Sequence, residues 1–118
     1  MTDSDRRLWD AAFDVVRRRK EFDSYGSPAK AVKALRRRCP WADEQQCRSA
    51  FDTTFKLYEE AIKIVNAHGD ELCDEYEATS NYPPMTDCGS ELAQSFEDVP
   101  PETCLDTVRW IWYWHHMR

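Results

Sequence analysis

The longest regular pattern of apolar residues runs through positions 43–68. Its apolar side chains recur at i, i+3, i+4 and i+7, the spacing that places them on one face of a helix. They are Cys47, Ala50, Phe51, Thr54, Phe55, Tyr58, Ala61, Ile62 and Val65. A face this wide is typical of a helix that is covered from more than one side. The pattern therefore predicts a long central helix against which other helices pack.

Two shorter apolar patterns precede the central helix. The first predicts a helix over residues 4–22, capped by Ser4. The second begins at Ser27 and Pro28, a cap followed by a proline at the first helical position. This helix should end before Pro40, because the residue ahead of a proline disfavours helical geometry.

The region after the central helix contains more breaks. Residues 70–77 predict a short acidic helix, or alternatively a bent continuation of the central one. Residues 79–89 include prolines and a glycine and predict the longest irregular segment. Ser90 is positioned to cap a further helical piece.

Pro100 and Pro101 introduce the last element. The residues that follow the helical period in it are Cys104, Leu105, Val108, Ile111, Trp112 and His115. The same stretch also fits an edge strand with alternating tryptophans on one side. We favour a helix, because no other segment offers a strand partner and isolated strands are unstable.

Together these patterns predict an all-α, single-domain bundle over residues 1–118. It has four main helices and one or two short ones around a long central helix at about residues 43–68. The 118 residues, 42% of them apolar, suffice to bury a core. No apolar run reaches the ~20 residues of a membrane span, and the first residues lack the apolar centre of a signal peptide. We therefore expect a cytoplasmic protein with no membrane partner.

Charge is distributed unevenly along the chain. Residues 1–40 carry 11 Lys or Arg against 6 Asp or Glu, whereas residues 41–118 carry 5 against 16. The resulting excesses of +5 and −11 make up the net charge of −6. Such a division is typical of nucleic-acid binding by the basic part, of packing between the parts, or of head-to-tail association.

The central helix carries three acid-before-base pairs at i, i+4 on its outer side, each worth about 0.2–0.5 kcal/mol. These predicted pairs are Glu44–Arg48, Asp52–Lys56 and Glu59–Lys63.

Basic clusters near the ends of the first two helices are the candidate nucleic-acid-binding residues. They are Arg17, Arg18, Arg19, Lys20, Arg36, Arg37 and Arg38, with Arg6, Arg7, Lys30 and Lys33 as further contributors. The simpler interpretation is compensation of the helix dipoles and pairing with acidic residues. The sequence pI of about 5.0 also differs from the basic footprint usual for such proteins.

Two other groups are candidate protein-binding surfaces. One is the acidic group Asp70, Glu71, Asp74 and Glu75. The other is the aromatic group Trp110, Trp112, Tyr113 and Trp114, which one helix face cannot bury entirely. Because Trp and Tyr are common interface anchors, this group indicates a homodimer or another protein partner, unless the rings fill the core.

Catalytic and cofactor motifs are missing from the sequence. With three glycines the chain has no P-loop, no G-x-G-x-x-G and no G-x-S-x-G. None of the five cysteines forms a C-x-x-C pair, so we expect free buried thiols, with a zinc site as the alternative. We expect no enzyme activity, no cofactor and no metal.

The sequence thus predicts a small acidic helical protein that binds another protein or itself, in a regulatory, adaptor or inhibitor role. The alternative is a nucleic-acid-binding regulator that uses the arginines of the first two helices.

Overall fold

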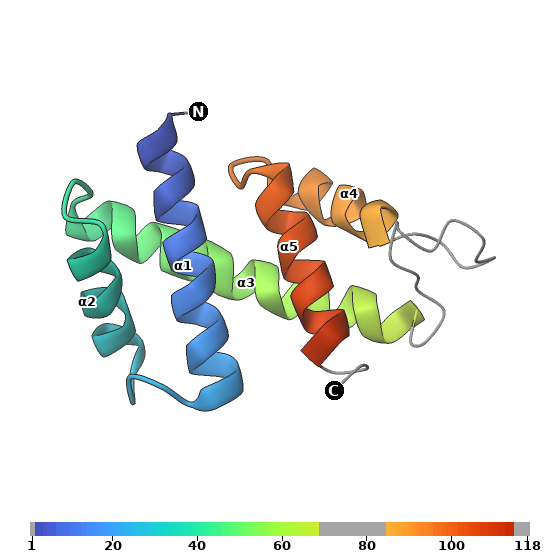
Figure 1. The fold of residues 1–118 in the computed structure, drawn as a ribbon, viewed down its shortest axis with the longest axis horizontal. Coiled ribbons are helices and arrows are strands. Elements are labelled where there is room, and N and C mark those ends of the chain that lie inside the picture. Colours follow the sequence, from blue (N-terminus) through green and yellow to red (C-terminus); the bar gives the residue numbers. More distant parts are fainter. Residues whose placement is uncertain (1, 69–84, 115–118) are drawn as a thin grey trace. The chain divides into compact units, whose positions relative to one another are not determined.

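The computed structural model describes residues 2–68 and 85–114, which form five α-helices (Figure 1). These residues contain no β-strand, so the prediction of an all-α helical bundle is confirmed. The helices are α1 (Asp3–Phe22), α2 (Pro28–Arg38), α3 (Glu44–His68), α4 (Met85–Ser95) and α5 (Pro101–Trp112).

The chain divides into two compact units, Met1–Tyr58 and Glu59–Arg118. Unit 1 contains α1, α2 and the first part of α3, and unit 2 contains the last part of α3 with α4 and α5. The long central helix is confirmed, and it contributes residues to both units. A single domain over the whole chain stays a prediction.

The start of α1 differs from the expected one. Thr2, not Ser4, is the cap: its hydroxyl accepts a hydrogen bond from the Asp5 N–H at 3.2 Å. The Asp5 carboxylate in turn accepts one from the Thr2 N–H at 3.2 Å. This reciprocal capping box satisfies two backbone donors at once, and it begins the helix two residues earlier than a cap at Ser4 would.

The starts of α2 and α3 agree with the prediction. The Ser27 hydroxyl accepts a hydrogen bond from the Lys30 N–H at 3.3 Å, and Pro28 occupies the first turn. Ahead of α3, the Asp43 carboxylate accepts from the Gln46 N–H at 2.8 Å, and the Gln46 side chain accepts from the Asp43 N–H at 2.9 Å. Both helices therefore begin at side chains that satisfy otherwise unpaired donors.

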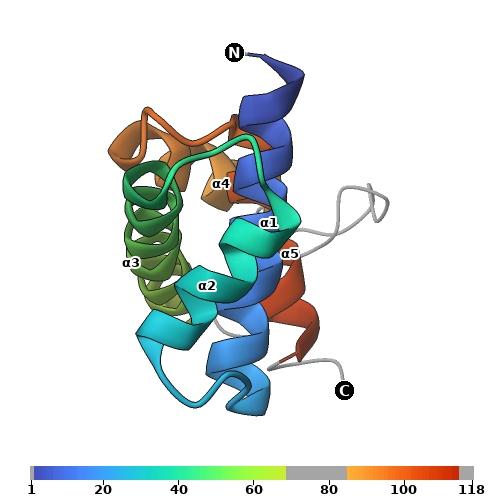
Figure 2. The same ribbon diagram turned by 90° about the vertical axis from the view of Figure 1, so that its left-hand side faces the viewer.

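The three helices of unit 1 bury the apolar faces expected from the sequence. In Figure 2, α2 lies in front, with α1 on one side and α3 on the other. A hydrogen bond of 2.6 Å from the Tyr58 hydroxyl to Glu21 ties the end of α1 to α3. The Lys20 ammonium lies 4.5 Å from the centre of the Phe55 ring, a cation–π contact between the same two helices. Buried side chains of this unit include Ala12, Val15, Val16, Ala31, Leu35, Cys47, Ala50 and Leu57.

In unit 2, α4 and α5 pack closely against each other. The expectation of an irregular segment up to Gly89, followed by a cap at Ser90, was wrong at its end, because α4 begins at Met85. Gly89 lies inside the helix, where an added Cβ would come within 3.1 Å of the Leu105 side chain. The glycine permits this close approach of α5, so here it is a packing residue and not a helix breaker.

The last element is a helix, as we favoured, and Pro101 occupies its first turn. Tyr113 and Trp114 continue it as a wider, π-type turn. The predicted helix over residues 70–77 lies outside the described residues.

Of the three ion pairs expected along α3, one forms as predicted. Arg48 bonds to Glu44 at 3.2 Å. Lys63 bonds to Glu60 at 3.1 Å instead of to Glu59, because residues three apart are also neighbours on a helix surface.

Candidate protein-binding site

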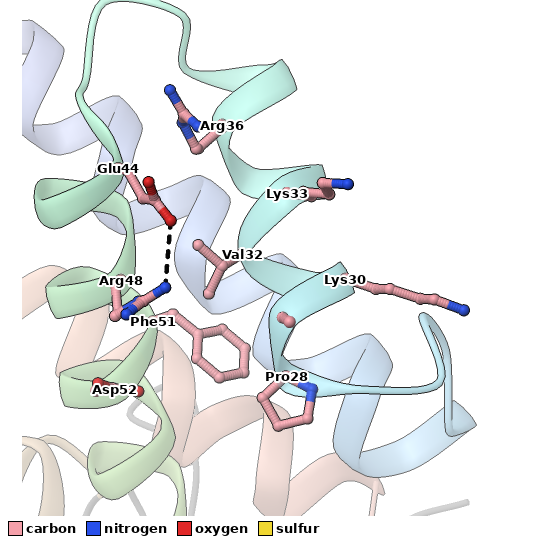
Figure 3. A pocket seen from close by; sticks show the side chains of 10 residues that line it. Pro28, Lys30, Val32, Lys33, Arg36, Glu44, Arg48, Phe51 and Asp52 are labelled. Atoms are coloured by element: carbon pink, nitrogen blue, oxygen red, sulfur yellow. Dashed lines mark hydrogen bonds and ion pairs between the residues drawn. The ribbon is translucent and has the colours of Figure 1, made fainter.

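A groove lies between α2 and the first part of α3, entirely within unit 1 (Figure 3). Its volume is about 410 Å³. Pro28, Val32 and Phe51 form an apolar floor, with the Phe51 ring directed from α3 toward Pro28. The groove therefore offers apolar contact at the surface, between two helices that have already satisfied their own backbone hydrogen bonds.

Local sequence explains how this floor forms. The cap and proline at the start of α2 place Pro28 at one end of the groove, and Val32 follows one turn later. Phe51 lies on the buried face of α3 and is 3% exposed. The floor of the groove is thus formed by residues at the edge of the unit 1 core, which a ligand would contact through the groove.

The two walls of the groove differ in charge. The α2 wall carries Lys30, Lys33 and Arg36, all exposed. The α3 wall carries Glu44, which bonds to Arg48, and Asp52, which has no cationic partner among the described residues. In Figure 3, Lys30 and Lys33 extend away from α3 on the outer side of α2, while Arg36 is the α2 cation on the side of Glu44.

The cations of α2 continue past the groove. Lys30, Lys33, Arg36 and Arg37 are all exposed and follow a spacing of i, i+3, i+6 and i+7, which places them on one face; we call them the cationic stripe. Two further depressions, of about 390 and 410 Å³, lie beside this stripe. Within the described part of the chain, none of its four cations forms an ion pair with a carboxylate.

Other arginines of unit 1 behave differently, because three of them converge on Asp14. Arg18 Nε lies 3.0 Å and Arg38 Nη1 lies 2.6 Å from Asp14 Oδ2, and Arg17 bonds to Oδ1. The Asp14 side chain is only 19% exposed. We call these four residues the Asp14 cluster; it links α1 to the end of α2.

The pKa of the Asp14 carboxyl reflects this environment. Partial burial disfavours the charged form. Hydrogen bonds from Arg17 and Arg38, together with the charges of Arg17 and Arg18, outweigh burial and hold the pKa below its ordinary value. Asp14 therefore stays ionised and neutralises part of the surrounding positive charge.

No family model, curated protein or solved structure matches this chain. Among the described helices, none has both the length and the apolar character of a membrane span. The chemistry of the groove and its border is therefore the basis for a functional inference.

The structure divides the residues predicted to bind nucleic acid. Arg17, Arg18 and Arg38 form ion pairs with the Asp14 carboxylate. Lys20 lies over the Phe55 ring. Arg36 and Arg37 belong to the cationic stripe, and Arg19 is half-buried at the end of α1. The seven residues thus differ in the partners that they have among the described residues, and their role in binding nucleic acid stays a prediction.

Some aromatic residues of the predicted protein-binding surface pack against one another within the chain. Trp110 stacks on Trp114 with ring centres 5.2 Å apart, and its ring centre lies 6.4 Å from that of Tyr113. Tyr113 is 55% exposed, whereas Trp112 is half-buried and its indole N–H has no acceptor among the described residues. The acidic candidates Asp70, Glu71, Asp74 and Glu75 lie outside the described residues.

Four of the five cysteines, Cys39, Cys47, Cys88 and Cys104, are free and buried, as expected for each of them. Within residues 2–68 and 85–114, no three His, Cys, Asp or Glu side chains come together in an arrangement that could hold a metal ion.

The groove itself was missed at the level of sequence. Lys30 and Lys33 were grouped with all basic residues, although their spacing with Arg36 and Arg37 already separates them as one face. Phe51 was assigned to the core, and nothing in the sequence shows that its ring borders a surface groove.

Proposed function

We propose that the protein is a non-catalytic protein-binding module, of regulatory, adaptor or inhibitor type, and that a segment of its partner docks in the α2–α3 groove. The observation that supports this function is the apolar floor of Val32, Phe51 and Pro28 beside four cations that form no ion pair among the described residues. Apolar contact with such a floor provides affinity, and border charges provide orientation and faster encounter.

The lining combines an apolar floor with exposed charged side chains, and this combination supports binding. A groove between two helices is also the shape that accepts a peptide segment, whose apolar side chains enter while its polar side chains remain at the edge.

A peptide-display experiment tests this proposal without knowledge of the natural partner. A random peptide library is selected on the immobilised full chain, and the enriched peptides are mapped by amide chemical-shift changes. Shifts concentrated in residues 28–36 and 44–52 are expected. Enrichment of peptides that map elsewhere, for example to residues 110–114, or of none at all, would contradict the proposal.

Leucine substitutions at two exposed alanines provide a direct test of the groove and its matched control. Ala29 is exposed and lines the groove, so Ala29→Leu fills part of it and should weaken the enriched peptides about fivefold or more. Ala67 is an exposed alanine of α3 outside the groove, so Ala67→Leu should leave binding unchanged.

A further inference from the structure

The cationic stripe gives information about the chemistry of the partner. From Lys30 to Arg37 it extends over about 10 Å at ~1.5 Å per residue, or two turns of a helix. Four like charges on one face repel one another, and no described carboxylate forms an ion pair with any of them. The neighbouring Asp14 cluster also gathers cationic side chains, three arginines, but has a carboxylate at its centre. An acid supplied by a partner would fill that role at the stripe.

We infer that the groove takes an acidic amphipathic helix of another protein. Its apolar edge lies on Val32 and Phe51, and its carboxylates, spaced three or four residues apart, lie over the cationic stripe. The inference rests on the proposed function and adds the chemical class of the partner.

Charge complementarity favours an acidic helix over a nucleic acid. Glu44 and Asp52 line the opposite wall of the same groove, so a phosphate backbone lying along it would meet two carboxylates. A helix, in contrast, can present acids on the side facing α2 and neutral or basic residues on the side facing Asp52.

Three synthetic helical peptides test the inference. They share the same leucines at i, i+3, i+4 and i+7 and carry Glu, Gln or Lys at the flanking polar positions. Fluorescence anisotropy with the full chain is expected to give about tenfold tighter binding of the Glu peptide than of the Gln peptide, since several exposed ion pairs each add a few-fold. The difference should decrease at high salt.

Charge reversal identifies the site. Lys33 borders all three depressions around α2, so Lys33→Glu should weaken the Glu peptide about fivefold and strengthen the Lys peptide. Lys56→Glu makes the same change at an exposed lysine of unit 1 outside the groove and should have no such effect. Circular dichroism checks that both variants remain helical.

The outcomes separate this inference from the proposed function. Equal binding of the Gln or Lys peptide in the groove would overturn the acidic partner and leave the protein-binding function in place. Binding of none of the peptides would count against both. Binding of duplex DNA that is tighter than binding of the Glu peptide would overturn the inference in favour of a nucleic acid. Self-association that Lys33→Glu abolishes would overturn it in favour of a second copy of the chain.

Discussion

The helix pairs α1–α2 and α4–α5 are held together by different interactions. Where α1 meets the end of α2, charged groups from both helices gather on the single carboxylate of Asp14. Where α4 meets α5, the contact depends on shape, because Gly89 leaves room for the backbone and side chain of Leu105. The first contact requires an ionised carboxylate, and the second requires the absence of a side chain at position 89.

This difference shows that helix pairs in one all-α protein can be stabilised by interactions that respond to different changes, such as a change in pH or in side-chain volume. An ion cluster responds to pH and to the loss of its central charge. Close apolar packing responds to side-chain volume and is indifferent to protonation. Changes that affect one pair should therefore leave the other unaffected.

The largest effect is expected from a branched side chain at position 89. A Cβ there would lie 3.2 Å from the Leu105 Cα, which belongs to the α5 backbone and cannot move as a side chain does. Gly89→Val should therefore lower the free energy of unfolding by about 2–3 kcal/mol. In Gly89→Ala, a gain in helix propensity of about 1 kcal/mol offsets much of this cost. Urea unfolding measures both.

Gln94→Val is the control for this experiment, because it places the same branched residue at an exposed position of α4. Equal stability of Gly89→Val and Gln94→Val would show that α5 does not require the space at Gly89.

Removal of the carboxylate at position 14 should have the next largest effect. Asp14→Ala leaves three guanidinium groups close together without their common partner, and a loss of about 1–2 kcal/mol is expected. Asp10 is exposed on the same helix and takes part in none of these ion pairs, so Asp10→Ala should cost much less. Equal losses in the two variants would contradict a special role of the Asp14 cluster.

The same cluster predicts a pH dependence. The pKa of Asp14 is lowered in the folded state, so its ionised form stabilises the fold at every pH above the unfolded value of about 3.9. This contribution is lost as pH falls from there through the folded pKa. The stability difference between wild type and Asp14→Asn should therefore be constant near neutrality and decrease in acid.

The deficit of Gly89→Val should not change over the same range, because no titrating group takes part in that contact. A parallel acid dependence of the two deficits would mean that the two helix pairs do not respond separately.

The smallest expected effect is a gain in stability. Lys33 has like charges at i−3, i+3 and i+4, so Lys33→Glu replaces repulsion with attraction and should add about 0.2–0.5 kcal/mol. Lys56 instead has acids at i−4, i+3 and i+4, and Lys56→Glu should lose a similar amount. Thermal unfolding compares the two variants.

A gain at Lys33 would mean that the cationic stripe lowers stability, as expected for residues kept for binding. A loss equal to that of Lys56→Glu would remove this support for a binding role.

Much of this architecture could be predicted from sequence, because the signals are local. The apolar period of α3 and the Ser27–Pro28 start of α2 each depend on neighbouring residues alone, and the structure agrees with both. The predicted start of α4 was wrong, because the role of Gly89 depends on Leu105 in another helix.

The candidate site was harder to predict for the same reason. Spacing alone distinguishes the cationic stripe, but the link between Arg38 and Asp14 joins residues 24 positions apart. Without that contact, the arginines of the Asp14 cluster and those of the stripe look alike. Phe51 likewise follows the period of a core residue, and its position at the groove depends on how α2 packs.

The buried thiols provide a way to follow how the two units open. Burial, and to a lesser extent nearby acids, raises the pKa of Cys88 and Cys104 to about 11, and burial also raises the pKa of Cys39 and Cys47. Because the thiolate is the reactive form, each cysteine should be alkylated slowly until its surroundings open. Mass spectrometry of timed alkylation would then report unit 1 through Cys39 and Cys47, and unit 2 through Cys88 and Cys104. The alkylation rates of these four native cysteines would thus show whether the two units open together or one after the other.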